Sequence, residues 1–263
     1  MIKYFKIFRI ILINAYLRDS IIGGVIIFNL VISLLEIIMT IILFNIIFAN
    51  VTSLAGWNYY QVLFIFSMMK LTSVLSGLIY RKGLGKMANE MVRMGDYDFH
   101  LAKPVNPMIM VSLCEPKIYQ IITLFAVVTL AIFSAIKSTV AIPMINIIFF
   151  GIFFILGQIL FYFLSVISIV PTFWFVRLYS LYDVMNRFLQ FARYPAGIYS
   201  NILKAFLFVV FPVLAVTYIP AWVLFNPIDY RYAIYMVLVT VFFGFIATKL
   251  WRLGEKHYGS ASS

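Results

Sequence analysis

Six runs of the sequence contain no charged residue, and they constrain the fold more than any other feature. They are Ser20–Leu35, Ile37–Met69, Ile118–Ile136, Ser138–Val176, Ala205–Ile228 and Tyr232–Thr248. A helix needs about 20 apolar residues to cross the hydrocarbon core of a bilayer. The runs predict an all-α membrane protein with six transmembrane helices, at about 22–48, 58–80, 118–136, 143–170, 203–225 and 232–250.

The composition supports one membrane domain over residues 1–263. Hydrophobic residues make up 64% of the chain and charged residues 11%, whereas a soluble domain carries about 25% charged residues. The net charge of +11 raises the question of nucleic acid. The basic residues lie at the ends of the apolar runs rather than on one face, which indicates membrane topology and contact with anionic lipids instead.

The distribution of lysine and arginine predicts the orientation. Alternate connections are basic, so 17 of the 20 basic residues fall on one side of the membrane. Two others, Lys137 and Arg231, fall on the opposite side, and Lys70 lies inside a crossing. Because cytoplasmic connections carry the excess of positive charge, both termini are expected in the cytoplasm of a multi-pass protein.

Three segments are expected to do more than cross. Residues 1–20 combine basic residues at every third position with apolar ones, as in a helix that lies on the membrane surface. Residues 171–202 repeat this mixture and are expected to form a cytoplasmic juxtamembrane segment. Residues 218–231 contain two prolines and are expected to form an extracellular re-entrant turn, the alternative being a plain kinked helix end.

Motifs for catalysis, metal binding and nucleotide binding are missing from the sequence. The two histidines, His100 and His257, stand alone, and no HExxH, GxSxG or GxxxxGK[ST] motif occurs. We therefore expect no enzyme activity, metal or other cofactor on this chain. Asp96, Asp98 and Asp183 near the cytoplasmic face leave a membrane-embedded enzyme as a weaker alternative.

Two charged residues, Glu36 and Lys70, fall near the middle of consecutive antiparallel crossings. An ion at that depth costs at least about 2.5–3.5 kcal/mol. Two explanations stay open: the residues pair with each other, or they line a substrate path.

The connection 81–117 is the longest polar segment. A short helix is expected over 85–94, with Met87, Met91 and Met94 on one stripe, and Gly95 is expected to end it. Such a stripe usually packs inside its own chain. In a cytoplasmic connection it is also suited to a partner protein.

Three stretches carry a resemblance to a known family. They are 91–107 (MVRMGDYDFHLAKPVNP), 187–199 (RFLQFARYPAGIY) and the terminal 258–263 (YGSASS). Together with the expected six crossings and basic surface helix, the sequence resembles the permease subunits of ABC-2 type transporters over nearly its whole length. It is similar to a bacterial branch whose members are often linked to the export of drugs, antibiotics or lipids.

The resemblance implies a type V exporter-like permease fold in the bacterial plasma membrane. Such permeases pair as homodimers or heterodimers, and each binds a cytoplasmic ABC ATPase subunit that holds ATP and Mg²⁺. The first cytoplasmic loop carries a coupling helix, and the cargo passes along the dimer interface beside the second and fifth crossings. A stand-alone channel or secondary transporter is the alternative.

The resemblance also gives contact residues for the ATPase. Carried onto this sequence they are Glu90, Arg93, Gly95, Asp96, Asp98, Lys103 and Pro104, and the methionine stripe adds Met87 and Met91. The expected cargo is hydrophobic or amphipathic: a drug, a peptide or a lipid-like molecule. Glu36 and Lys70 are not part of the resemblance and remain candidates for the substrate path on their own chemistry.

Overall fold

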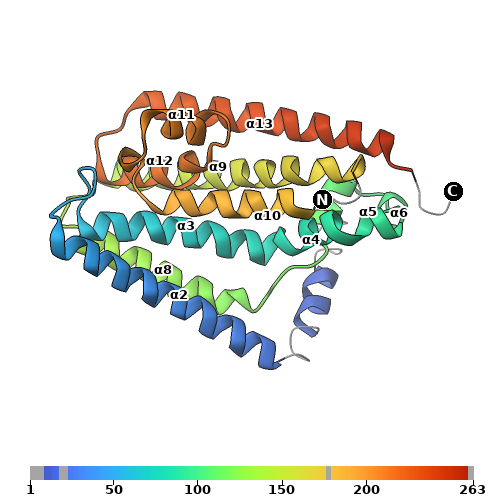
Figure 1. Ribbon diagram of the computed structural model, residues 1–263, viewed down its shortest axis with the longest axis horizontal. Coiled ribbons are helices and arrows are strands. Elements are labelled where there is room, and N and C mark those ends of the chain that lie inside the picture. The colour runs from blue at the N-terminus through green and yellow to red at the C-terminus, as the bar shows by residue number, and fades with distance from the viewer. Residues whose placement is uncertain (1–8, 18–22, 176–178, 260–263) are drawn as a thin grey trace.

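The computed structural model describes residues 9–17, 23–175 and 179–259, and the described part contains helices but no β-strand. Figure 1 shows a bundle of long helices that lie side by side, with short helices gathered at one end. Five helices are long and apolar enough to cross a membrane. They are α2 (Gly23–Asn50), α3 (Tyr59–Ile79), α8 (Gln120–Lys137), α9 (Met144–Ile169, extended by the 3₁₀ turn η2, Val170–Phe173) and α13 (Tyr230–His257).

These five helices match five of the six predicted crossings, so the chain is a multi-pass membrane protein. Local chemistry fixes where they begin. The Asn58 side chain accepts a hydrogen bond from the Gln61 N–H (2.9 Å), and the Gln61 side chain accepts one from the Asn58 N–H (3.0 Å), which forms a capping box before α3. The Asp229 carboxylate accepts from the Arg231 N–H (2.8 Å) and begins α13.

The two ends of the bundle are distinct. One end, called here the loop end, carries α4 (Arg81–Lys86), the π-helical turn η1 (Met87–Met91), α5 (Val92–Met94), α6 (Asp98–Leu101) and α7 (Pro107–Leu113). The other end, called the hairpin end, carries the connection 51–58 and the helices α11 (Asn201–Val209) and α12 (Val213–Phe225). Helix α13 ends at the loop end (Figure 1).

Helix α10 (Tyr179–Phe188) corrects the prediction for 171–202. With η3 (Leu189–Arg193) and η4 (Ala196–Ile198) it runs along the bundle instead of staying at one end. At the loop end the Tyr182 hydroxyl donates to the Arg81 carbonyl (2.8 Å). At the hairpin end a methyl group added at Gly197 would lie 2.8 Å from the Cβ of Ala55. Polar side chains such as Arg187 lower the hydropathy of this segment, which is why the sequence pattern misplaced it.

The predicted crossing at 203–225 is not one straight helix. Helices α11 and α12 meet at an angle of 97°, and nine residues of α11 span only about 14 Å. The bend lies at 210–212, where Pro212 cannot continue a helix. Within 218–231 the chain turns only at 226–229, between α12 and α13, because Pro220 lies inside α12 and that helix continues to Phe225.

The core of the bundle lies around α3, α9 and α12. All residues of α12 except Trp222 are buried. Helix α12 packs closely on α9, because a Cβ at Gly157 would lie 2.8 Å from the Val216 carbonyl oxygen. The Thr217 hydroxyl donates to the Ala192 carbonyl (2.7 Å) and ties α12 to η3.

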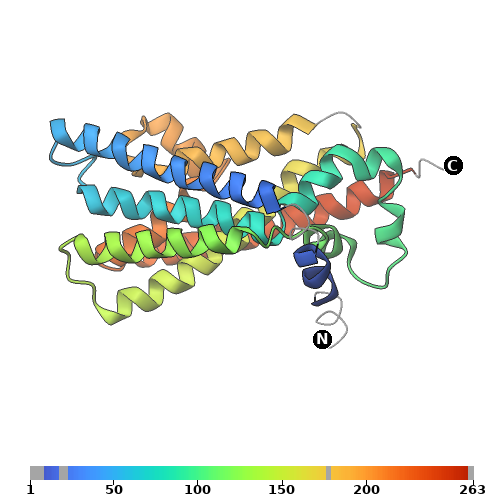
Figure 2. The same ribbon diagram turned by 90° about the horizontal axis from the view of Figure 1, so that it is seen from below.

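The predicted surface helix over 1–20 is described only in part. Residues 9–17 are helical, and the remainder of that prediction lies outside the described residues. Figure 2 shows this short helix at the loop end, at a steep angle to α2. Its position on a membrane surface stays a prediction.

Candidate functional site

The loop 81–117 is built on one continuous helix from Arg81 to Met94, which contains the π-helical turn η1. The helix ends at Gly95, whose φ of +81° lies in the left-handed region that favours glycine. The Tyr97 N–H then donates back to the Met91 carbonyl (3.2 Å) and closes the turn that follows the helix. The predicted end of the helix at Gly95 is therefore present, and its start is earlier than expected.

The methionine stripe faces inward for most of its length. Met87 is 0% exposed and Met91 3%, so both pack inside this chain and neither is available to a partner. This corrects the prediction that they contact an ATPase. Met94, the third member, is 60% exposed. The stripe is therefore buried at Met87 and Met91 and exposed at Met94, the last residue before Gly95.

Tyr97 anchors the loop to the last helix. Its ring is fully buried between Phe173 and Tyr258, with centroid distances of 5.3 and 5.1 Å. Its hydroxyl donates to the Glu255 carboxylate (2.7 Å), and the Trp251 indole N–H donates to the same oxygen (2.8 Å). Burial, followed by the nearby Glu255, raises the pKa of Tyr97 and keeps it a neutral donor. These contacts tie the loop to α13.

Two ion pairs join α4 to the segment before α8. The Glu115 carboxylate binds the ammonium groups of Lys82 (2.7 Å) and Lys86 (2.9 Å). Burial works against the charged form of Glu115, but the two lysines outweigh burial and lower its pKa. Helix α4 also packs tightly on α7, because a Cβ at Gly83 would lie 2.2 Å from the Val111 carbonyl oxygen.

The outer surface of the loop is a mixed patch, called here the loop patch. It consists of exposed residues from η1, α5, α6 and the following turn: Glu90, Arg93, Met94, Phe99, Leu101, Lys103 and Pro104. Gly95, Asp96 and Asp98 are half-buried beneath it. Phe99 (70% exposed) and Leu101 (43% exposed) were missed in the sequence. The sequence does contain a pattern that could have revealed them, because both are apolar and flank His100 in an otherwise polar connection.

Glu36 and Lys70 meet inside the bundle. Their carboxylate and ammonium groups are 2.5 Å apart, which joins α2 to α3. The Lys70 side chain is 9% exposed, whereas that of Glu36 is 49% exposed. Lys70 therefore depends on Glu36 for its counter-charge, and Glu36 also faces the outside of the chain.

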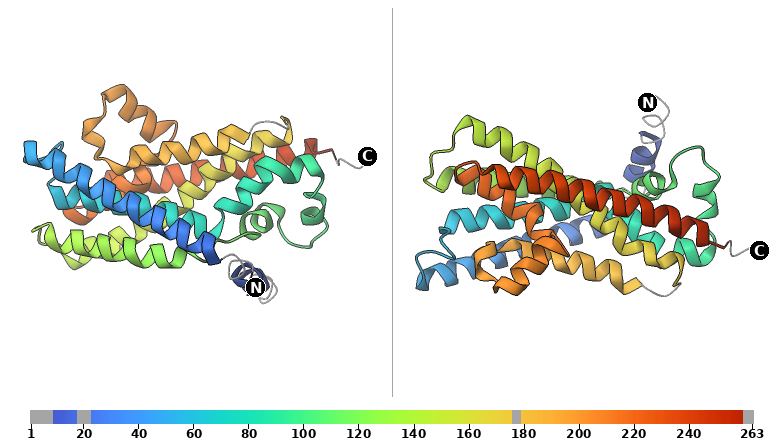
Figure 3. Two further views of the ribbon diagram at one scale, coloured as in Figure 1. Left: turned by 60° about the horizontal axis from the view of Figure 1, so that its bottom comes forward. Right: turned by 90° about the horizontal axis from the view of Figure 1, so that it is seen from above.

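Glu36 belongs to a face formed by three helices. Helices α2 and α10 flank α3 on the same side of the bundle in Figures 2 and 3. Helix α10 carries the exposed side chains of Asp183 and Arg187. We call the side of the bundle formed by α2, α3 and α10 the polar face. Helices α8 and α9 expose mainly isoleucine, valine and phenylalanine.

No group of three His, Cys, Asp or Glu side chains within the described ranges is arranged to hold a metal ion. The site offers contact surfaces and buried anchors.

Comparison with known proteins identifies the chain. The model of a family described as ABC-2 family transporter protein matches residues 34–262, which include the loop, the polar face and both ends of the bundle. The curated proteins give no match, and neither do the solved structures. Since the match extends over most of the sequence, the chain belongs to the ABC-2 transporter family, as a permease-type membrane protein.

Proposed function

We propose that the chain is the permease subunit of an ATP-driven ABC exporter in a bacterial plasma membrane. One observation carries the proposal beyond family membership. The loop patch is exposed at one end of the bundle, while the same loop is anchored through Tyr97 to α13. Such a loop can receive motion from a partner and pass it to a membrane helix.

The chain would cross the membrane six times, with α10, η3 and η4 together as the fifth crossing. Helices α11 and α12 would then form a re-entrant hairpin from the outer side. This arrangement preserves the charge asymmetry. Lys137, Lys204 and Arg231 would lie outside, and Lys70, Arg187 and Arg193 inside crossings, which leaves 14 of the 20 basic residues in the cytoplasm with both termini.

A separate ABC ATPase subunit would bind the loop patch and hold ATP and Mg²⁺. Met94, Phe99 and Leu101 supply the apolar centre that a docking surface needs. Glu90, Arg93 and Lys103 surround it with charges of both signs. Closure of two ATPase subunits on ATP would move the loops. Tyr97 and Glu255 would carry that motion into α13, so this chain itself needs no catalytic group.

A second permease would cover the polar face. Asp183 and Arg187 lie on a helix that runs along the bundle, and charged side chains there are costly against lipid. Pairing of two such faces would exclude lipid and leave a route between two subunits. A hydrophobic or amphipathic cargo suits that route, because α2 adds exposed Ile32, Leu35 and Met39 around Glu36.

The docking step is tested with the permease coexpressed with an ABC ATPase subunit. Phe99→Glu places a charge at the centre of the loop patch, and copurification of the ATPase should fall at least about tenfold. Phe175→Glu is the matched control, because Phe175 is also exposed (62%) at the loop end but lies outside the patch. Equal copurification with both variants would contradict the assignment of the patch.

A further inference from the structure

A cavity of about 460 Å³ lies at the hairpin end between α11, α12 and the first turns of α13. Its volume falls within the range of about 300–1,000 Å³ that is typical of small-molecule sites. Neither the loop patch nor the polar face includes it. The cavity is therefore a separate candidate site.

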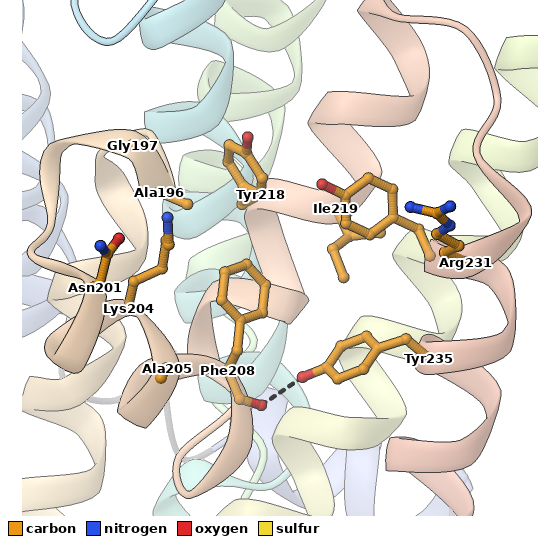
Figure 4. Close-up of a pocket in the computed structure, with 11 residues that line it drawn as sticks. Ala196, Gly197, Asn201, Lys204, Ala205, Phe208, Tyr218, Ile219, Arg231 and Tyr235 are labelled. Atoms are coloured by element: carbon orange, nitrogen blue, oxygen red, sulfur yellow. Dashed lines mark hydrogen bonds between the residues drawn. The ribbon is translucent and has the colours of Figure 1, made fainter.

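The cavity is polar at one end and apolar at the other. Figure 4 shows Asn201 and Lys204 on one side and Arg231 on the opposite side, with Tyr218 between them. Phe208 and Tyr235 line the part toward the bend between α11 and α12. The Tyr235 hydroxyl donates to the Phe208 carbonyl, which joins α13 to α11 at the floor of the cavity.

The two cations lack a counter-charge of their own. Within the part of the chain that the structure describes, neither Lys204 nor Arg231 forms an ion pair with a carboxylate. Lys137, at the end of α8, also lies at the hairpin end but does not line the cavity. Two unpaired cations above an apolar floor suit an anionic headgroup with an acyl chain.

We propose that this cavity binds an anionic phospholipid of the outer leaflet, with its headgroup at the part of the cavity that Lys204 and Arg231 line from opposite sides. Its acyl chain would lie over Phe208 and Ile219. The bound lipid would hold α11 against α13 and stabilise the bent hairpin. The inference rests on the proposed function only for the statement that the hairpin end faces outward.

The test is lipid retention by purified permease in nanodiscs of phosphatidylcholine with phosphatidylglycerol, measured by native mass spectrometry. Lys204→Gln and Arg231→Gln should each reduce retained phosphatidylglycerol about tenfold. Lys137→Gln removes the same charge at the same end but outside the cavity, and should retain as much as the wild type. Equal retention by all three variants would overturn the proposal.

A second measurement, the melting temperature, distinguishes an anionic lipid from free phosphate. It also shows whether a variant fails to retain lipid because it is misfolded. Added phosphatidylglycerol should raise the Tm of the wild type and of Lys137→Gln, and should not raise that of the double variant Lys204→Gln/Arg231→Gln. An equal rise with phosphatidylcholine or with inorganic phosphate would contradict an anionic lipid site. The ATPase should copurify with the double variant as with the wild type. Its failure to bind the wild type would instead contradict the proposed function and leave the lipid result intact.

Discussion

Helices α12 and α10 are a contrasting pair, because the apolar α12 is buried inside the protein and the more polar α10 lies along the bundle. Helix α12 is apolar around its whole circumference, yet α3, α9 and η3 bury all of it except Trp222. Helix α10 carries Asp183 and Arg187, yet it runs along the bundle with these charges exposed. Apolar residues therefore mark burial inside the protein in one case, and charged residues mark an uncovered face in the other. The hydropathy of a helix therefore does not tell whether protein or lipid surrounds it. The packing of the helix in the bundle has to be known as well.

The largest effect is expected at the pair on the polar face. Glu36→Gln removes the carboxylate and leaves the buried Lys70 ammonium without a counter-charge, at a cost of about 3 kcal/mol of unfolding free energy. The double variant Glu36→Gln/Lys70→Met should recover most of that loss. Unfolding in mixed detergent micelles measures both. A double variant as unstable as the single one would show that the ion pair does not explain these charges.

The next effect tests the packed side, where α12 lies against α9. Gly157→Ala places a methyl group 2.8 Å from the Val216 carbonyl oxygen and should destabilise the chain by about 2 kcal/mol. Gly151→Ala is the control on the same helix, because a methyl group there meets nothing within 4 Å. It should leave stability unchanged or slightly raised. Similar melting temperatures for both variants would contradict the close approach of these helices.

A smaller effect is expected at the exposed charge of α10. If the polar face meets water and a second permease rather than lipid, Arg187 is an ordinary surface residue. Arg187→Leu should then change the unfolding free energy of the permease by no more than about 0.5 kcal/mol. It should still weaken cross-linking between two permeases in membranes. Leu238→Arg on the apolar outer side of α13 should cost about 3 kcal/mol. A gain of about 3 kcal/mol from Arg187→Leu would instead place α10 against lipid.

The smallest effect lies outside the bundle, at the ion pairs of the loop. Since the pKa of Glu115 is lowered in the folded chain, its contribution to stability is present at neutral pH and is lost as the pH falls through the folded pKa. Glu115→Gln should therefore cost about 1 kcal/mol or less at neutral pH. The difference from the wild type should vanish only below the ordinary glutamate pKa of about 4.3. A difference that disappears already near pH 6 would contradict the lowered pKa.

The sequence predicted five long helices and missed the arrangement of the segments between α9 and α13. The bounds of α2, α3, α8 and α9 agree with the predicted crossings to within two residues. The interior of α12 looks the same in sequence, because a protein core is as apolar as a lipid tail. Periodicity could not show it as one arm of a bent pair, although Pro212 marked the bend.

The candidate site was predicted in a similar, partial way. Gly95 and the charged residues of the loop were found because turns and exposed charges have local signatures. Met87 and Met91 were assigned to a partner, but their burial depends on α10, an element far along the chain that packs against η1 and adds Tyr182 to the same buried cluster. Phe99 could be recognised as exposed only after Tyr97 was seen to hold α6 with the ring of Phe99 outward. Tertiary contacts decide which side of a short helix is free.

The most direct test of the account is the side of the membrane on which Asn201 lies. Burial raises the pKa of the native Cys114 thiol to about 11, so it reacts slowly, and Cys114→Ala removes the remaining background. In that background Asn201→Cys is labelled in intact cells with a membrane-impermeant maleimide. Ser53→Cys at the hairpin end and Asn89→Cys in the loop serve as the references. If α10 is the fifth crossing, Asn201→Cys is labelled from outside as Ser53→Cys is. Labelling only after permeabilisation, as expected for Asn89→Cys, would contradict the crossing by α10 and the re-entrant hairpin that follows it.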